Sequence, residues 1–293
     1  MYEINLVDRS FDQEAAGPCS ISIQANQSGL SYCITDETVN NYVLFRKHRF
    51  EHVYLTGDLI EKTAEVLDQE SIFDLPFQSV RFIGYTQQST LVPDAYFDRR
   101  KMKDYLAFNC AGEMDPELFC NHLEFPGIYN VFALPEELVS LVARYFKKVE
   151  FSNQTTSFLR QITSRKNALE QDAVYVGLNA GFFDIAATGQ GKLRIYNSFQ
   201  YASEHDLLYY VIFVINQMKF DPLQVPLFLS GELSSRLTYY EILKQYVPGT
   251  KYDDVSGTPQ LAPGLKSLTP YRFLNLLNLQ MCASSEEHTG DEE

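Results

Sequence analysis

The sequence predicts an α/β fold of two domains that share one order of elements: three strands, a helix, a strand and a helix. Three observations support this prediction. The chain has 293 residues, which suits about two domains. Its hydrophobic fraction of 45% is sufficient for two cores. The same succession of hydrophobic patterns occurs twice, and such a repeat indicates two similar domains that face each other across a cleft.

The first half begins with three strands. Alternating apolar and polar residues predict strands that begin at Cys19, Gly29 and Asn41 and form an antiparallel meander. Asp58 is the predicted cap of the helix that follows, over residues 58–71. Strands are then predicted at 79–85, 128–134 and 149–153, and helices within 90–112 and at 135–148 and 155–169.

The second half repeats this order. Strands are predicted at 172–180, 181–188, 191–202 and 225–230, and helices at 204–220 and 234–246. The first of these helices is capped by Ser203 and is apolar on all sides, so we expect it to be buried. We therefore divide the chain into an N-terminal domain at 1–154, a C-terminal domain at 155–280 and a disordered acidic tail at 281–293.

The charge of the chain excludes some classes of function. The formal net charge is −14, of which residues 1–154 carry −10, so we expect no nucleic-acid partner. No apolar run approaches the roughly 20 residues of a membrane span. The first residues are acidic, unlike the basic start of a signal peptide, and we expect a cytoplasmic protein.

Two dense basic clusters interrupt the acidic first half, at residues 46–49 and 99–103. We interpret both as solvated faces, with contacts to an anion or a partner as the alternative. His48 and His52 have a zinc-like spacing, but on a strand they would lie about 13 Å apart. We therefore expect no metal site.

Residues 129–246 resemble the bacterial pilus-assembly and cell-division proteins of the actin-like ATPase superfamily. Residues 174–206 resemble their second phosphate-binding hairpin with the strand and helix after it, and residues 227–246 resemble their adenosine segment. The whole chain, without its tail, most resembles a family of uncharacterised bacterial proteins with an actin-like ATPase fold. This resemblance implies two RNase H-like domains in tandem in an actin-like ATPase architecture.

The resemblance also implies where a nucleotide would bind, and the chain departs from the pattern there. In the first hairpin, Gln24 stands where an acid is expected and Asn26 where a glycine is expected. In the second hairpin, Asp184 is kept, but Gly177 takes the place of an acid. The other departures are Asn179 and Ala180 for two glycines before Gly181, Phe182 and Phe183 for two threonines, and Ser230-Gly231-Glu232 for a Gly-Gly pair.

These departures predict a non-catalytic protein that acts as a cytoplasmic interaction or scaffold module for a protein partner, with no cofactor. The alternative is an ATP-binding protein with weak ATPase or kinase activity, which would use ATP and Mg²⁺ in the interdomain cleft. Its nucleotide site would consist of Gln24, Asn26, Asn179, Gly181, Asp184, Gly231 and Glu232. A third hypothesis is a small-molecule site lined by Phe182 and Phe183.

Overall fold

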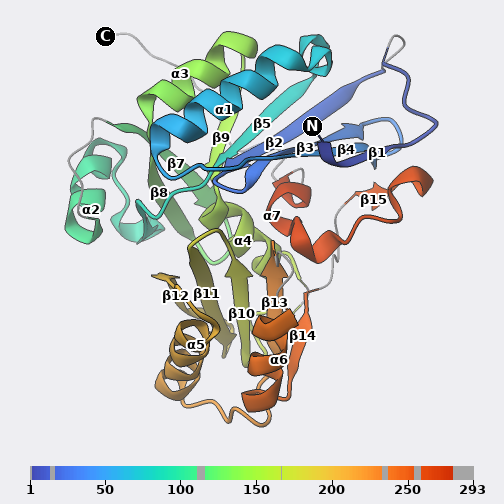
Figure 1. The fold of residues 1–293 in the computed structure, drawn as a ribbon. Coiled ribbons are helices and arrows are strands. Elements are labelled where there is room, and N and C mark those ends of the chain that lie inside the picture. The colour runs from blue at the N-terminus through green and yellow to red at the C-terminus, as the bar shows by residue number, and fades with distance from the viewer. Residues whose placement is uncertain are drawn as a thin grey trace.

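Three β-sheets organise the computed structural model, which describes residues 2–13, 17–110, 116–165, 167–232, 237–253 and 259–279. Within these residues, the two larger sheets have seven and five strands and the third has three. Figure 1 shows the two larger sheets in two parts of the molecule, one above the other. The order of their strands reveals how the chain is built.

The first sheet has the strand order β1-β4-β3-β2-β5-β9, and β15 pairs in parallel with β4. Its strands are β1 (Tyr2–Val7), β2 (Cys19–Asn26), β3 (Gly29–Asp36), β4 (Asn41–Arg49), β5 (Ser79–Gly84), β9 (Glu150–Asn153) and β15 (Gln260–Leu261). The three strands β2 to β4 form an antiparallel meander, and β5 and β9 continue the sheet in parallel with β2.

The second sheet has the strand order β12-β11-β10-β13-β14. Its strands are β10 (Ala173–Leu178), β11 (Phe182–Gly189), β12 (Lys192–Gln200), β13 (Leu227–Gly231) and β14 (Thr250–Tyr252). Here too an antiparallel meander is continued by two parallel strands. Apart from β1 and β15, the two sheets therefore have the same topology, which confirms the predicted repeat of two α/β domains.

The third sheet is an insertion in the first domain, between β5 and α3. It consists of β6 (Ser89–Pro93), β7 (Pro116–Leu123) and β8 (Ile128–Pro135), in the order β6-β8-β7. Helix α2 (Met102–Asn109) packs on it through the buried Leu106. The sequence predicts β8 and a helix in this region, but not β6 or β7.

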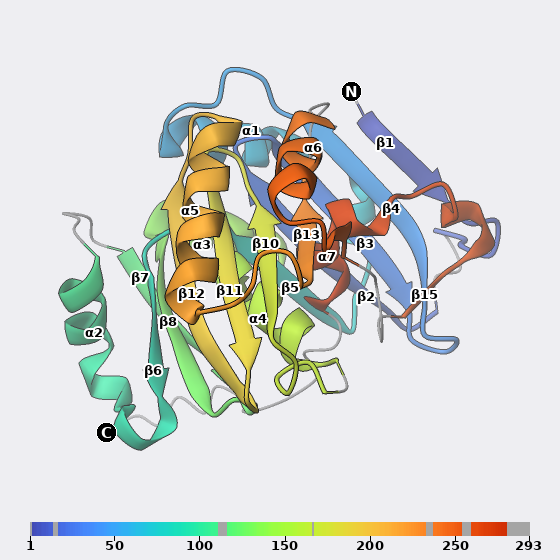
Figure 2. The same ribbon diagram turned by 90° about the horizontal axis from the view of Figure 1, so that it is seen from below.

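Helices cover both faces of each large sheet. Helices α1 (Thr56–Gln69) and α3 (Glu136–Tyr145) share one core with the first sheet, and α7 (Leu274–Leu277) packs on its opposite face. Helix α4 (Gln154–Thr163) packs on one face of the second sheet. Helices α5 (Glu204–Met218) and α6 (Leu237–Tyr246) cover the other, as Figure 2 shows from below.

Local signals explain how several helices begin. The Ser203 hydroxyl accepts a hydrogen bond from the Asp206 amide at 3.3 Å, which confirms Ser203 as the cap of α5. Helix α1 differs from the prediction, because its cap is Leu55 and not Asp58. Asp58 lies three residues later, and its carboxylate accepts from the Leu55 amide at 2.9 Å. The acid stabilises the helix start, but from inside the first turn.

Helix α5 also differs from the prediction that it is buried on all sides. Its Leu207, Val211 and Val214 are buried against the second sheet, whereas the Tyr209 and Phe213 side chains point outward and are 64% and 48% exposed. No element among the described residues covers that side of the helix. The predicted tail at 281–293 lies outside the described residues.

Candidate functional site

A cavity of about 520 Å³ lies between the two large sheets. Five of the seven residues of the predicted nucleotide site line it, namely Asn26, Asn179, Gly181, Gly231 and Glu232. The other two lie one hydrogen bond behind its wall. Gln24 accepts from Tyr85 and Asp184 accepts from Asn179, and both of these partners line the cavity. The fold therefore brings all seven residues to one place.

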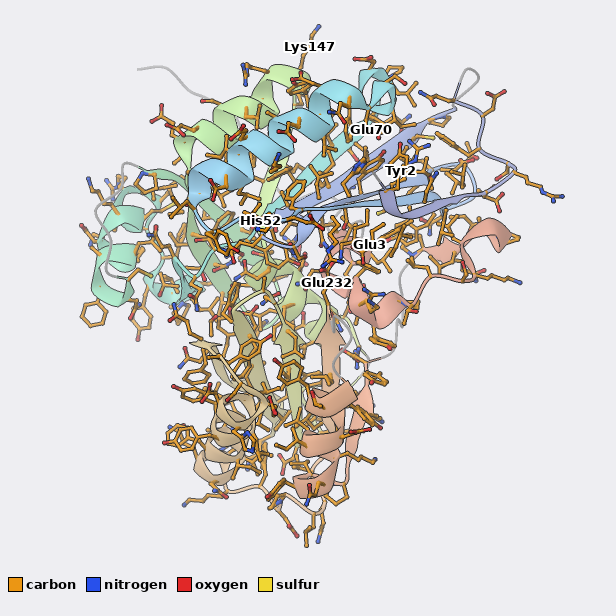
Figure 3. The ribbon with its side chains drawn as sticks, viewed as in Figure 1. Tyr2, Glu3, His52, Glu70, Lys147 and Glu232 are labelled. Carbon is orange, nitrogen blue, oxygen red and sulfur yellow. The ribbon has the colours of Figure 1, made fainter. Side chains whose placement is uncertain are left out.

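An ion cluster joins the two domains at this cavity. Lys47 Nζ on β4 lies 2.8 Å from Glu232 Oε1, which follows β13, and 3.1 Å from Glu3 Oε2 on β1. The side chains of Lys47 and Glu232 are 4% and 13% exposed. In Figure 3, Glu3 and Glu232 lie close together at the junction of the domains. An ion pair this well shielded from water is much less screened than one on the surface.

The first hairpin, between β2 and β3, meets Glu232 directly. The Ser28 hydroxyl is hydrogen-bonded to the Glu232 carboxylate and lies 2.7 Å from Asn26 Oδ1. Asn26 also accepts from the Ser28 amide at 2.8 Å, so its side chain closes the turn. The Glu232 carboxylate thus lies against the hydroxyl-bearing turn that the resemblance assigns to phosphate.

Gln24 is buried within β2, with 2% of its surface exposed. Its Oε1 accepts from the Tyr85 hydroxyl at 3.3 Å, and the Asn275 amide donates to the same hydroxyl at 3.2 Å. Burial raises the pKa of Tyr85, and the nearby Glu232 and Asp184 carboxylates raise it further. Tyr85 is therefore a neutral hydrogen-bonding group, and Gln24 has no charge to offer a cation.

Asp184 on β11 is the carboxyl group of the second hairpin, and it is 1% exposed. Burial raises its pKa from 3.8 to about 6, although hydrogen bonds from Tyr196 and Asn179 oppose the rise. The Tyr196 hydroxyl donates to Oδ1 at 2.7 Å and Asn179 Nδ2 donates to Oδ2 at 2.8 Å. Both oxygens therefore have protein partners, and Asp184 holds the hairpin turn in place.

Gly177 on β10 stands where the resemblance expects an acid, and the structure leaves little room there. A Cβ atom at this position would lie 3.1 Å from the ring of Phe158, which is a fully buried residue of α4. The phenyl ring of Phe158 therefore packs where an acidic side chain would begin.

Gly231 ends β13 in a conformation that favours glycine. Its φ is 99°, and a Cβ atom would lie 2.1 Å from the carbonyl oxygen of Leu178. This close approach brings the chain after β13 against the second hairpin. The position of Glu232, the next residue, depends on it.

Phe182 and Phe183 are not among the residues that line the cavity, so the prediction that they line a small-molecule site is wrong. Phe183 is completely buried in the core between the second sheet and its outer helices, near Tyr201 and Tyr210. Side chains alternate between the two faces of a strand. Asp184 points to the face covered by α4, so Phe183 points to the opposite face.

The basic cluster at 46–49 is not a solvated face, contrary to the prediction. Lys47 and His48 are 3% and 7% exposed. Arg46 Nη1 forms an ion pair with Glu70 at 3.1 Å on the α1 side of the sheet, and His48 Nε2 lies 3.3 Å from the same carboxylate. Lys47 points to the opposite side, and Figure 3 shows Glu70 above the sheet and Glu232 below it. Because side chains alternate along β4, Arg46 pairs with Glu70 on one face of the sheet and Lys47 pairs with Glu232 on the other.

Sequence reasoning missed several residues that line the cavity: Glu3, Lys47, Arg49, Tyr85, Arg272 and Asn275. For Lys47 the sequence did offer a signal, because a basic residue within a largely apolar strand can indicate a buried charge.

The part of the chain that the structure describes contains no group of three His, Cys, Asp or Glu side chains that could hold a metal ion. His48 is on β4, and His52 follows the strand with a φ of 59°.

The comparisons with known proteins agree with this architecture. A family profile described as "Protein of unknown function (DUF3822)" matches residues 8–249. The chain belongs to the DUF3822 family. No curated protein matches it.

Two solved structures show the fold. A Bacteroides thetaiotaomicron protein with an actin-like ATPase fold and unknown function has a TM-score of 0.77 and 18% identity, over 93% of this chain and 99% of the other. A PilM-PilN type IV pilus biogenesis complex contains a chain with a TM-score of 0.57 and 11% identity, over 90% of this chain and 99% of the other. This DUF3822 chain therefore has the actin-like ATPase fold that its sequence predicts.

One further property concerns membranes. Among the residues that the structure describes, no helix has both the length and the apolar character of a membrane crossing.

Proposed function

We propose that this DUF3822 protein is a non-catalytic member of the actin-like fold, a cytoplasmic module that binds a protein partner and needs neither ATP nor Mg²⁺. The observation that carries the proposal is the carboxylate of Glu232, which contacts Ser28 of the first hairpin and Lys47 of β4. It places a fixed negative charge beside the turn where a nucleotide phosphate would bind. A phosphate there would have to displace Glu232 or accept its repulsion.

The residues at the positions expected to hold Mg²⁺ support the same proposal. Gln24 stands where the resemblance expects the acid that holds Mg²⁺ through water, and Gly177 stands where it expects an acid in the second hairpin. Phe158 packs against Gly177. Asp184 is the carboxylate that remains, and Tyr196 and Asn179 already occupy its oxygens. Magnesium has a strong preference for carboxylate and phosphate oxygens, so this set of residues offers it little.

An interaction role is supported by one exposed surface on the inserted sheet. The segment from Tyr96 to Phe108, which we call the α2 surface, exposes four cations and two aromatic rings: Tyr96, Arg99, Arg100, Lys101, Lys103 and Phe108. Asp98 pairs with Arg100, and Asp104 is the exposed acid of α2. Tyr96 and Phe108 are 75% and 89% exposed. The PilM-PilN neighbour is itself a protein complex. An acidic partner with apolar residues fits such a surface.

The catalytic part of the proposal is tested by calorimetry and turnover with Mg-ATP on the full chain. We expect no saturable binding in the micromolar range and no phosphate release above a buffer blank. Steady ATP turnover that Asp184→Asn abolishes would show that the cleft is an enzyme site.

The interaction part is tested by chemical cross-linking and capture from cells with variants of matched charge change. Arg99→Glu with Arg100→Glu reverses the α2 surface, whereas Lys147→Glu with Lys148→Glu reverses an exposed pair after α3 that lies far from it in Figure 3. We expect one protein to be captured by the wild type and the control but not by the α2 variant. Equal capture by all three would remove the α2 surface from the proposal.

The second candidate function is nucleotide binding in the same cavity. The specific observation in its favour is that a space of about 520 Å³ remains between the hairpins and the turn at Gly231. A thermal-shift titration with ATP and ADP, with and without Mg²⁺, separates the two functions, because a ligand that binds only the folded state raises the melting temperature.

A further inference from the structure

More cations than acids line the interdomain cavity, although the protein has a net charge of −14. Lys47, Arg49 and Arg272 line it, and the acids that line it are Glu3 and Glu232. Both acids pair with Lys47. The two arginines have no ion-pair partner among the described residues, so no described carboxylate neutralises the charge of these two guanidinium groups.

Arg272 gives a second indication that the cavity binds an anion. Its Nε atom is buried and has no hydrogen-bond partner among the described residues. The guanidinium lies over the ring of Phe273, with its central carbon 5.3 Å from the ring centroid, so its plane is held by packing. A buried donor without an acceptor costs stability, and a planar guanidinium is best satisfied by a carboxylate or phosphate group.

The other walls supply neutral hydrogen-bonding groups. Asn275, Tyr85 and Ser230 line the cavity beside the cations. The volume of about 520 Å³ falls within the range of about 300–1,000 Å³ that is typical of small-molecule sites. Charge, donors and size together indicate a small polar ligand and not an apolar one.

We infer that this cavity binds a small organic dianion, with one carboxylate or phosphate group on Arg272 and Arg49 and a second anionic group near Lys47. The second group competes with the Glu232 carboxylate for Lys47, because both are anions that need the same cation. Ligand binding therefore weakens the contact between the two domains at Ser28 and Lys47. This inference goes beyond the proposed function, since it requires neither a nucleotide nor a known partner.

The test is a thermal-shift and calorimetric titration of the full chain with inorganic phosphate and with succinate, against sodium chloride at equal ionic strength. The variants are Arg272→Gln and Arg49→Gln. The matched control is Arg144→Gln, which removes an exposed arginine of α3 outside the cavity. Because Arg49 is exposed, its variant keeps the test valid if Arg272→Gln does not fold.

We expect saturable binding of at least one of the two anions by the wild type and by the control. Each cavity variant should bind that anion about tenfold more weakly, and Glu232→Gln should bind it more tightly because one competing charge is gone. Succinate and phosphate as separate arms identify which anionic group the site prefers.

Two results would overturn the inference. One is the absence of saturable binding with both anions. The other is an equal response of Arg272→Gln, Arg49→Gln and Arg144→Gln, because the general stabilising effect of phosphate on folded proteins acts on all variants alike. Neither result depends on ATP turnover, so failure here and failure of the proposed non-catalytic function are separate outcomes.

Discussion

Lys47 Nζ lies 2.8 Å from Glu232 Oε1, which pairs a cation on the fourth strand of the first domain with a carboxylate directly after β13 of the second. The two residues are 185 positions apart in the chain. Because both side chains are shielded from water, each stabilises the position of the other. This pair is therefore one of the contacts that join the two domains.

The coupling between these two residues is measurable in a double-mutant cycle with Lys47→Met and Glu232→Gln. We expect a coupling of roughly 1–3 kcal/mol in the free energy of unfolding, since buried charges lose much when one partner is removed. The measurement is urea denaturation of the four variants.

Arg81 and Glu150 form the matched control pair for that cycle. Arg81 Nε lies 3.1 Å from Glu150 Oε2, but the Glu150 side chain is 61% exposed. The coupling of this pair should stay below about 1 kcal/mol. Equal couplings for the two pairs would contradict a shielded interdomain ion pair.

The stability of the protein should depend on the ionisation of Asp184. Its pKa is about 6 in the folded protein against 3.8 ordinarily, so the folded state holds the proton more tightly than the unfolded state. Its ionisation therefore lowers stability as the pH rises from about 4 to about 6, by up to about 3 kcal/mol. Asp184→Asn lacks this contribution, and its stability relative to the wild type should increase over that range.

Chemical denaturation at several pH values between 4 and 7 measures this difference. Asp104→Asn, which changes an exposed aspartate of α2, is the control and should follow the wild type at every pH. A constant difference between Asp184→Asn and the wild type would show that burial does not raise the pKa of this carboxyl group.

Gly231 should tolerate no side chain. Gly231→Ala brings a Cβ atom to 2.1 Å from the Leu178 carbonyl oxygen at a φ of 99°, and we expect a loss of about 2–4 kcal/mol. Gly57→Ala in the first turn of α1 is the control, because nothing lies within 4 Å of its Cβ position. It should be neutral or stabilising by about 0.5 kcal/mol. The measurement is the midpoint of urea denaturation. Equal stability of the two variants would disprove the prediction.

Restoring an acid at position 177 should not restore a metal site. Gly177→Asp introduces a carboxylate against the ring of Phe158, because the new Cβ atom alone would lie 3.1 Å from that ring, and we expect a loss of stability of about 2 kcal/mol or more. The double variant Gly177→Asp with Phe158→Ala should lose less stability than the sum of the two single losses, because the smaller side chain relieves part of the clash. Thermal denaturation with and without Mg²⁺ is the measurement, and stabilisation of Gly177→Asp by Mg²⁺ would contradict the prediction.

Much of the fold could be predicted because its signals are local. The meanders, the helices between strands and the cap at Ser203 all follow from hydrophobic alternation and side-chain chemistry within a few residues. The strands β1 and β15 and the short helix α7 could not be predicted in this way. For example, β15 has two residues and pairs with Asn41 and Tyr42, more than two hundred positions earlier. Such short elements exist only because a distant strand holds them.

In the candidate site, too, some features could be predicted from the sequence and others could not. The sequence by itself determined the repeat, the two hairpins and the turn at Gly231, together with the absence of the expected acids at Gln24 and Gly177. Only the tertiary structure decided that Lys47 is a buried partner of Glu232, that Phe183 belongs to the core, and that Arg49 and Arg272 share a cavity. The physical reason is that burial of a charge depends on what packs over it. For Lys47 that cover is the second domain and the chain segment around Phe273, which no local pattern on β4 encodes.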